Sequence, residues 1–138
     1  MTDQSHKEKM QERQTEQRKK VAELQDPDMG LVLVHTGAGK GKSSSAFGVV
    51  VRALGWKQRV GVVQFIKGAW STGERGVLEK FGDLIEWHSM GEGFTWETQD
   101  KARDIAAAER AWEKAEALMV DPGIALVVLD ELNIALRY

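Results

Sequence analysis

A glycine-rich segment that joins an apolar run to a helix-like stretch constrains the fold of this chain most. Residues 37–43 read Gly-Ala-Gly-Lys-Gly-Lys-Ser, and the continuous apolar run just before them predicts a buried strand over 30–36. From 43 to 54 apolar residues recur every three or four positions, and Gly55 stands where a helix C-cap glycine belongs. The segment therefore predicts a strand, a glycine turn and a helix in direct succession.

The rest of the chain repeats this alternation of strand and helix. Apolar runs at 60–66, 84–87 and 124–129 predict three more strands, and 73–81 and 100–120 are predicted to be helices. The long helix carries Ile105, Ala108, Trp112, Ala115 and Met119 on one face, which we expect to be buried. Strands that are apolar throughout predict an α/β fold with a mostly parallel sheet and helices on both faces. In such folds, ligands bind beyond the carboxyl ends of the strands.

Charge and composition narrow the possible functions. The 138 residues carry 19 Lys and Arg against 21 Asp and Glu, so the net charge of −2 gives no reason to expect a nucleic-acid or anionic-membrane partner. The absence of cysteine excludes disulfides, thiolate metal sites and cysteine nucleophiles. No apolar run approaches the roughly 18 residues of a membrane span. We expect a soluble protein that is not exported.

The first 26 residues differ in composition from the remainder. They contain six basic and six acidic side chains but few apolar ones, with Glu-to-Lys and Glu-to-Arg spacings typical of an exposed helix. We predict a charged N-terminal arm or lid over 1–26 and a separate folded domain over 27–138.

The glycine turn resembles the Walker A phosphate loop, although Thr36 occupies the first glycine position of the usual pattern. Its backbone N–H groups and the following helix N-terminus can surround phosphate oxygens, and a lysine adds positive charge. The residues expected to bind the nucleotide are Gly37, Ala38, Gly39, Lys40, Gly41, Lys42, Ser43 and Ser44. Ser43 supplies a hydroxyl suited to Mg²⁺, and Asp130 and Glu131 end the last strand with carboxylates that can reach the same ion. A P-loop NTPase-like fold that binds a Mg-nucleoside triphosphate is expected.

These motifs leave the reaction open, but longer stretches carry a resemblance. Gly37–Ser43, Val-Gln-Phe-Ile-Lys-Gly at 63–68, Gly-Glu-Arg at 73–75, Met-Gly-Glu-Gly-Phe-Thr-Trp-Glu-Thr at 90–98 and Leu-Asp-Glu-Leu-Asn at 129–133 closely resemble the P-loop type of ATP:corrinoid adenosyltransferases. The resemblance covers essentially all of the chain. It implies transfer of the 5′-deoxyadenosyl group of ATP to the Co(I) centre of a reduced corrinoid, with release of triphosphate, in cobalamin synthesis or salvage.

The resemblance also implies roles for individual residues. Lys42 and the loop amides would hold the phosphates, while Ser43 and Glu131 would ligate Mg²⁺ or Mn²⁺ with Asp130 nearby. Phe94 and Trp96 would press against the lower face of the corrinoid and displace its axial ligand, which makes the cobalt easier to reduce. The catalytic residues expected on this basis are Phe94, Trp96 and Lys42.

A flavin-based reductant, a homodimer and a cytoplasmic location are further expectations from the resemblance. Members of the family continue past the position of Tyr138, so we expect the sheet to be incomplete here. Two alternatives stay open: an ATPase or small-molecule kinase that cleaves at the γ-phosphate, and a nucleotide-binding fragment without turnover.

Overall fold

The computed structural model describes residues 3–24, 29–66, 72–90 and 101–137. The chain divides into two compact units, Met1–Val34 and His35–Tyr138.

The N-terminal unit contains helix α1 (Asp3–Glu23), which confirms the helix expected from the charge spacing. An ion pair of 2.9 Å between Lys20 Nζ and Glu16 Oε1 illustrates that spacing, and it is exposed.

The strand predicted over 30–36 is wrong: none of these residues belongs to a strand. Leu31 and Val32 are 82% and 84% exposed. A buried parallel strand needs hydrogen-bonded neighbours and cover on both faces. Within this unit the other described element is α1, which has no apolar stripe that could provide such cover.

The described part of the second unit has a parallel sheet of three strands in the order β2-β1-β3. The strands are β1 (Val60–Gln64), β2 (Ile85–Ser89) and β3 (Leu126–Asp130). Val62 of the central strand lies opposite Trp87 on one side and Val128 on the other. The parallel α/β architecture predicted from the sequence is confirmed, with strand bounds shifted by up to two residues.

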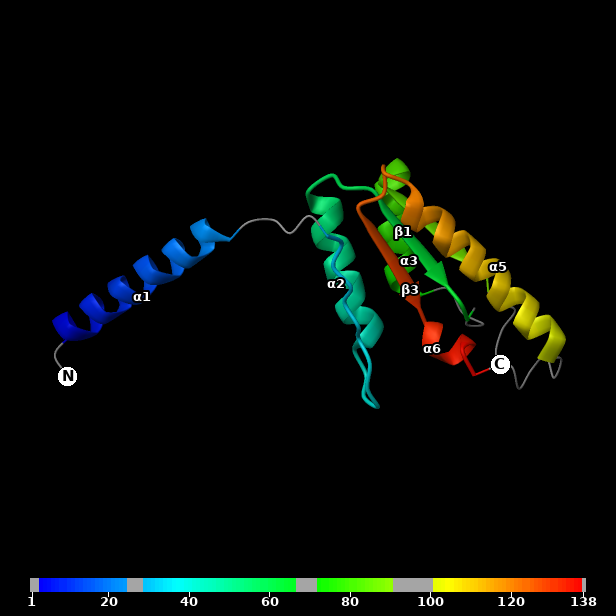
Figure 1. Cartoon of the computed structure of the whole chain (residues 1–138), viewed down its shortest axis with the longest axis horizontal. Coiled ribbons are helices and arrows are strands. Elements are labelled where there is room, and N and C mark those ends of the chain that lie inside the picture. Colours follow the sequence, from blue (N-terminus) through cyan, green and yellow to red (C-terminus); the bar gives the residue numbers. More distant parts are fainter. Residues whose placement is uncertain (1–2, 25–28, 67–71, 91–100, 138) are drawn as a thin grey trace. The chain divides into compact units, whose positions relative to one another are not determined.

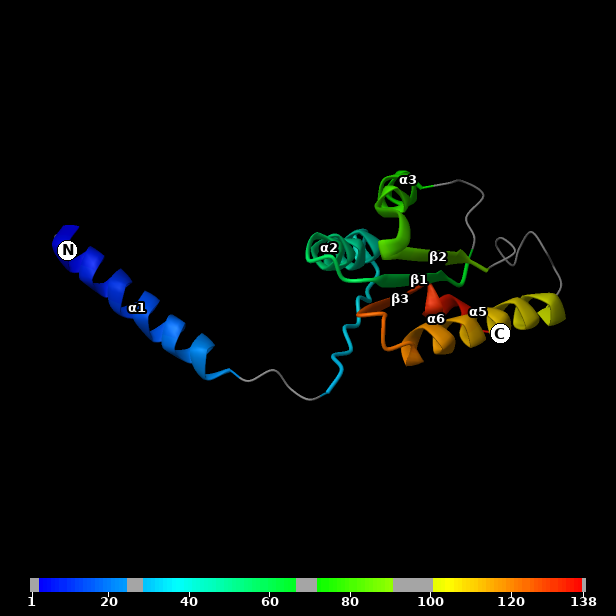
Figure 2. The same cartoon turned by 90° about the horizontal axis from the view of Figure 1, so that it is seen from above.

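Helices cover both faces of this sheet (Figures 1 and 2). The helices of the unit are α2 (Lys42–Gly55), α3 (Gly73–Leu78), α5 (Lys101–Val120) and α6 (Leu132–Ala135), with a 3₁₀ segment η1 (Glu79–Leu84) after α3. Figure 2 shows α2 and α3 on one face and α5 on the other.

Two hydrophobic clusters form because the side chains of β1 alternate between these faces. Val60 and Val62 pack with Phe47, Val50 and Leu54 of α2. Val63, together with Phe65 just after the strand, packs against Ala111, Ala115 and Leu118 of α5. This alternation is the reason that a continuous apolar strand is needed at the centre of the sheet.

The buried face of α5 differs from the expected one. Ala115 is buried as expected, but Trp112 and Met119 are 41% and 48% exposed, so the prediction is wrong for these two residues. The buried residues are Ala107, Ala111, Ala115 and Leu118. Three alanines at intervals of four let the helix lie close to the sheet, whereas an indole in the same place would hold it away.

The C-cap of α2 also differs from the prediction. Gly55 is the last helical residue, and the left-handed residue is Lys57, with φ of 58°. The Gln58 N–H donates to Ala53 O at 3.0 Å and the Lys57 N–H to Leu54 O at 2.9 Å, which is the Schellman pattern. The left-handed cap residue therefore lies two residues beyond the predicted glycine, and the helix includes Gly55.

Gly61 in the central strand is required by the close approach of α5. A Cβ at this position would lie 2.8 Å from Leu118 Cδ1, and Leu118 is buried. We expect Gly61→Ala to lower the free energy of unfolding by about 1 to 3 kcal/mol, measured by urea denaturation, because overpacking forces neighbouring side chains to shift. Gly55→Ala is the matched control, since its Cβ meets no atom within 4 Å. Equal stability of the two variants would contradict this account of the packing.

Candidate nucleotide site at the carboxyl ends of the strands

The glycine loop lies directly before α2 and depends on two glycines with positive φ. Gly37 has φ of 142° and Gly41 has φ of 102°, a region that favours glycine. Gly41 is the N-cap residue of α2 and has no side chain with which to cap the helix. The loop therefore leaves the helix N-terminus open to an external acceptor.

The backbone donors of this loop are available to a ligand. Within the described part of the chain, the N–H groups of 37–44 donate to no protein acceptor, and the first paired one is Ser45 N–H, at 2.9 Å from Gly41 O. Consecutive free N–H groups at a helix N-terminus favour anions through their partial positive charge. These open donors suit phosphate oxygens, and the phosphate-binding role of 37–44 stays a prediction.

Lys42 folds back over the loop that precedes it. Its Nζ donates to Gly37 O at 2.9 Å and to Gly39 O at 2.6 Å. These bonds hold the ammonium beside the free backbone donors and close the loop around it. One ammonium proton is left for a third acceptor, such as a phosphate oxygen.

A hydrogen bond joins the loop helix to the end of β3. Ser43 Oγ donates to Asp130 Oδ1 at 2.9 Å, although the two residues are 87 positions apart in the sequence. The structure thus brings together two of the three predicted metal ligands. Glu131 follows with φ of 61° in the turn before α6, and its role as a ligand stays a prediction.

The Asp130 carboxylate belongs to a network of side-chain hydrogen bonds between the ends of the three strands. Gln64 Nε2 donates to Asp130 Oδ2 at 3.1 Å. Gln64 Oε1 accepts bonds from Trp87 Nε1 at 3.0 Å and from Ser89 Oγ at 2.8 Å. The network therefore runs from β3 across β1 to β2.

Arg75 of α3 extends the network beyond the sheet. Its Nη1 donates to Ser89 Oγ at 3.1 Å and its Nε to Glu79 Oε1 at 2.8 Å. The guanidinium carbon lies 5.9 Å from the centroid of the Trp87 ring, within cation–π range. The arginine is therefore engaged by protein groups at this end of the sheet.

The donor set fits Mg²⁺ bound together with a nucleotide. Magnesium takes oxygen ligands at about 2.1 Å in octahedral geometry, which places neighbouring ligands about 3 Å apart. The Ser43 and Asp130 oxygens are already 2.9 Å apart. No group of three His, Asp or Glu side chains suited to a metal occurs among the described residues. Two protein oxygens, those of Ser43 and Asp130, suit an ion that takes its other ligands from phosphate and water.

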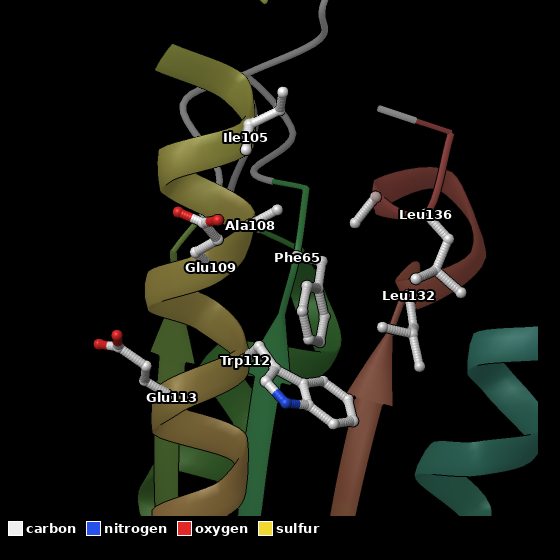
Figure 3. Close-up of a pocket in the computed structure, with 9 residues that line it drawn as sticks. Phe65, Ile105, Ala108, Glu109, Trp112, Glu113, Leu132 and Leu136 are labelled. Atoms are coloured by element: carbon white, nitrogen blue, oxygen red, sulfur yellow. The ribbon is translucent and has the colours of Figure 1, made fainter. Parts of the chain in front are cut away.

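An apolar cavity of about 570 Å³ lies at the same ends of the strands, on the α5 face of the sheet. In Figure 3 the side chains of Phe65, Trp112 and Leu132 point toward this space, whereas the carboxylates of Glu109 and Glu113 point away from it. Ile105, Ala108, Ala135 and Leu136 complete its lining. The exposure of Trp112 follows from this hollow between α5 and α6.

His88 belongs to a separate charged cluster. Its Nε2 lies 2.7 Å from Glu86 Oε1, which also accepts from Lys114 Nζ at 2.9 Å. The bond from Lys114, followed by that from His88, lowers the pKa of Glu86 below its ordinary value. The cluster links β2 to α5 and contains none of the predicted nucleotide or metal ligands.

Two of the predicted catalytic residues fall in the segment 91–100. Phe94 and Trp96 lie outside the described residues, as does Lys67 of the Val-Gln-Phe-Ile-Lys-Gly stretch. The predicted loop residues are placed together, exposed or half-buried, before and within the first turn of α2.

Comparison with known proteins decides the family. A sequence model of the family described as ATP:corrinoid adenosyltransferase BtuR/CobO/CobP matches residues 28–138, which is most of the chain. The chain belongs to this family. Its resemblance to P-loop corrinoid adenosyltransferases, read from the motifs, is thereby confirmed.

Curated relatives of the corrinoid adenosyltransferase family agree with this assignment. A corrinoid adenosyltransferase of Pseudomonas aeruginosa is 57% identical over 99% of this chain, one of a Sinorhizobium species is 53% identical over 88%, and one of Escherichia coli K12 is 41% identical over 100%. The chain spans 66%, 57% and 69% of the lengths of these three relatives.

The hydrogen-bond network at the strand ends contains three residues to which the sequence analysis gave no role: Gln64, Trp87 and Ser89. Gln64 lay inside a recognised stretch but was given no role, and the only signal was a polar residue that interrupts an apolar run. Trp87 and Ser89 gave no such signal. Among the described residues, no helix combines the length and apolar character of a membrane span.

Proposed function

We propose that this chain transfers the 5′-deoxyadenosyl group of ATP to the Co(I) centre of a reduced corrinoid and releases triphosphate. Family membership supports the reaction, and the observation that carries it to this chain is the Ser43–Asp130 contact. That contact sets a hydroxyl and a carboxylate beside an open phosphate loop. An ATPase or small-molecule kinase would share this loop, but the family match disfavours both.

The chemistry needs no nucleophilic side chain, because the Co(I) electron pair attacks C5′ of the ribose. The C5′–O bond breaks, its electron pair leaves with the triphosphate, and a cobalt–carbon bond forms. The task of the protein is to hold the departing polyphosphate and to orient the ribose. We assign the first task to Lys42 and to the backbone donors of 37–44.

Ser43, Asp130 and Glu131 are the residues that would hold Mg²⁺ or Mn²⁺. When bound, such an ion would neutralise part of the charge on the triphosphate leaving group. The half-buried Ser43–Asp130 pair keeps two oxygen ligands at the phosphate end of the site. A carboxylate on β3 next to the loop is hard to explain otherwise, because it would repel a metal-free polyphosphate.

The apolar cavity supports the corrinoid half of the proposal. Its volume lies within the range of small-molecule pockets, and its lining is largely hydrophobic. The segment that contains Phe94 and Trp96 joins β2 to α5, whose first half lines the cavity. We propose that these two aromatic residues contact the lower face of the corrinoid.

Further parts of the proposal rest on the resemblance. They are a flavin-based reductant that supplies the electron for Co(I), a homodimeric assembly, a cytoplasmic location and a role for residues 1–26 as a lid.

Product analysis tests the reaction directly. With MgATP and chemically reduced cobalamin, we expect adenosylcobalamin by its absorption spectrum and intact triphosphate by anion-exchange chromatography, in equal amounts. A reaction without protein is the control for chemical alkylation. ADP and phosphate as products would favour the ATPase or kinase, and ATP binding without any product would favour the nucleotide-binding fragment. Either result would overturn the proposal.

A further inference from the structure

Gln64 occupies a position from which it can control the carboxylate of Asp130. We propose that Gln64 is a positioning residue that holds Asp130 in the orientation needed to bind the metal of the metal–nucleotide complex. The inference rests on the proposed function only in assuming that the phosphate loop binds a nucleotide with a divalent cation. It is independent of the adenosyl transfer itself.

The backbone places Gln64 between two strand ends. It is the last residue of the central strand β1, and its Cα pairs with Asp130 of β3 on one side and with Ser89 of β2 on the other. The Phe65 N–H donates to Asp130 O at 3.0 Å, and the Met90 N–H donates to Gln64 O at 3.0 Å. Main-chain bonds therefore hold all three strand ends at a fixed distance from this side chain.

The orientation of the Gln64 amide follows from its partners. The indole Nε1 of Trp87 can only donate a hydrogen bond, so the atom that faces it must be the amide oxygen. Ser89 Oγ lies 2.8 Å from the same oxygen and serves as a second donor. The amide nitrogen is thereby directed at Asp130 Oδ2, at 3.1 Å. The assignment of oxygen and nitrogen thus rests on chemistry at both ends of the amide.

The indole ring is itself held in place, which makes it a firm support. Trp87 lies 5.4 Å from Phe47 between ring centroids, within the α2-side core. Arg75 covers it from α3 at 5.9 Å. The rigidity of the core is therefore passed through the Gln64 amide to the Asp130 carboxylate.

The two oxygens of Asp130 then have different partners. Oδ1 faces Ser43 Oγ of the loop helix, and Oδ2 is held by Gln64. With both bonds in place the carboxylate plane has one orientation, with Oδ1 toward the phosphate site. Without Gln64 the carboxylate could rotate about χ2, since Ser43 alone can bond either oxygen. Groups that orient metal-binding carboxylates in this way typically contribute 10- to 100-fold to metal affinity.

The Mg²⁺ dependence of ATP affinity separates positioning from general support of the fold. The affinity for ATP is measured by isothermal titration calorimetry in excess Mg²⁺ and again in excess EDTA, for the full chain and for Gln64→Met. Methionine keeps the length and volume of the side chain but can neither donate to Asp130 nor accept from Trp87. We expect affinity in Mg²⁺ to fall about tenfold. Affinity in EDTA should stay within about twofold, because the phosphate contacts of the loop are unchanged.

Gln58→Met is the matched control, because it makes the same chemical change at an exposed glutamine just before β1. It should match the unaltered chain under both conditions. A second variant, Trp87→Phe, keeps an aromatic ring against Phe47 but removes the indole donor. The amide can then turn over, so we expect an intermediate loss of about threefold, confined to Mg²⁺ conditions. This variant tests the same chain of contacts without altering Gln64.

Each result decides the inference. The inference is supported if ATP affinity falls only in Mg²⁺, and falls more for Gln64→Met than for Trp87→Phe. This holds whether or not the chain transfers an adenosyl group. Equal losses in Mg²⁺ and EDTA would overturn it, since Gln64 would then serve only the fold. Unchanged affinity in both would overturn it as well. If the unaltered chain binds ATP equally with and without Mg²⁺, Asp130 holds no metal, and the inference fails together with the proposed metal site.

Discussion

Replacement of Lys42 by alanine should weaken ATP binding about 10- to 150-fold, which corresponds to the loss of about 1.5 to 3 kcal/mol for a hydrogen bond to a charged group. The ammonium is bonded to Gly37 O and Gly39 O, which places it over the free backbone donors of the loop. The variant therefore loses both a positive charge on the phosphates and the bonds that close the loop. The dissociation constant is measured by calorimetry in Mg²⁺.

Lys80→Ala is the matched control for this prediction. It removes the same side chain from an exposed position in η1, away from the glycine loop in sequence. We expect its affinity for ATP to equal that of the unaltered chain. If Lys42→Ala also binds ATP normally, the glycine turn is not the phosphate site, and the function proposed for this chain loses its main structural support.

Replacement of Asp130 by asparagine should weaken ATP binding in Mg²⁺ about 100-fold, near the upper end of what perturbation of a metal site costs. The substitution preserves the shape of the side chain but removes the charge that attracts the cation. Without Mg²⁺ the sign should reverse, and ATP should bind as well as or better than before, because a carboxylate close to the phosphates no longer repels them. Calorimetry in Mg²⁺ and in EDTA measures both effects.

Asp83→Asn, at an exposed position in η1, controls for the change in net charge. It should alter neither affinity by more than about twofold, because surface charges outside the site are screened by salt. Loss of affinity in EDTA as well as in Mg²⁺ for Asp130→Asn would mean that this residue supports the loop through Ser43 and does not bind a metal.

Local patterns predicted the architecture well where a segment carries enough information by itself. The apolar runs at 60–66 and 124–129 became neighbouring parallel strands, and the apolar spacing after Ser43 became α2. The glycine loop was located from residue types alone, because positive φ and free backbone donors are typical of the sequence Gly-x-Gly-x-Gly directly before a helix. The secondary structure of long segments with regular apolar spacing, and the position of the glycine loop, were thus predicted from local sequence alone.

Predictions failed where the outcome depended on what lies beside a segment. The apolar run 31–34 has strand composition, yet strand formation requires a partner for its backbone groups. Trp112 has the periodicity of a buried residue, but alanines define the packed face of α5 and leave the indole at a cavity. In both cases the prediction followed from apolar character, but the tertiary contacts that decide burial could not be inferred from the local sequence.

The sequence by itself determined the parallel α/β class, the position of the glycine loop at 37–43, the family and the identity of the carboxylate residues at the end of the last strand. Only the tertiary structure decided that Ser43 meets Asp130, that Gln64 links this carboxylate to Trp87 and Ser89, and that a cavity opens between α5 and α6. The physical reason is that periodicity and loop chemistry act over a few residues. Hydrogen bonds between side chains at separate strand ends depend instead on the order and register of the strands, which no local pattern specifies.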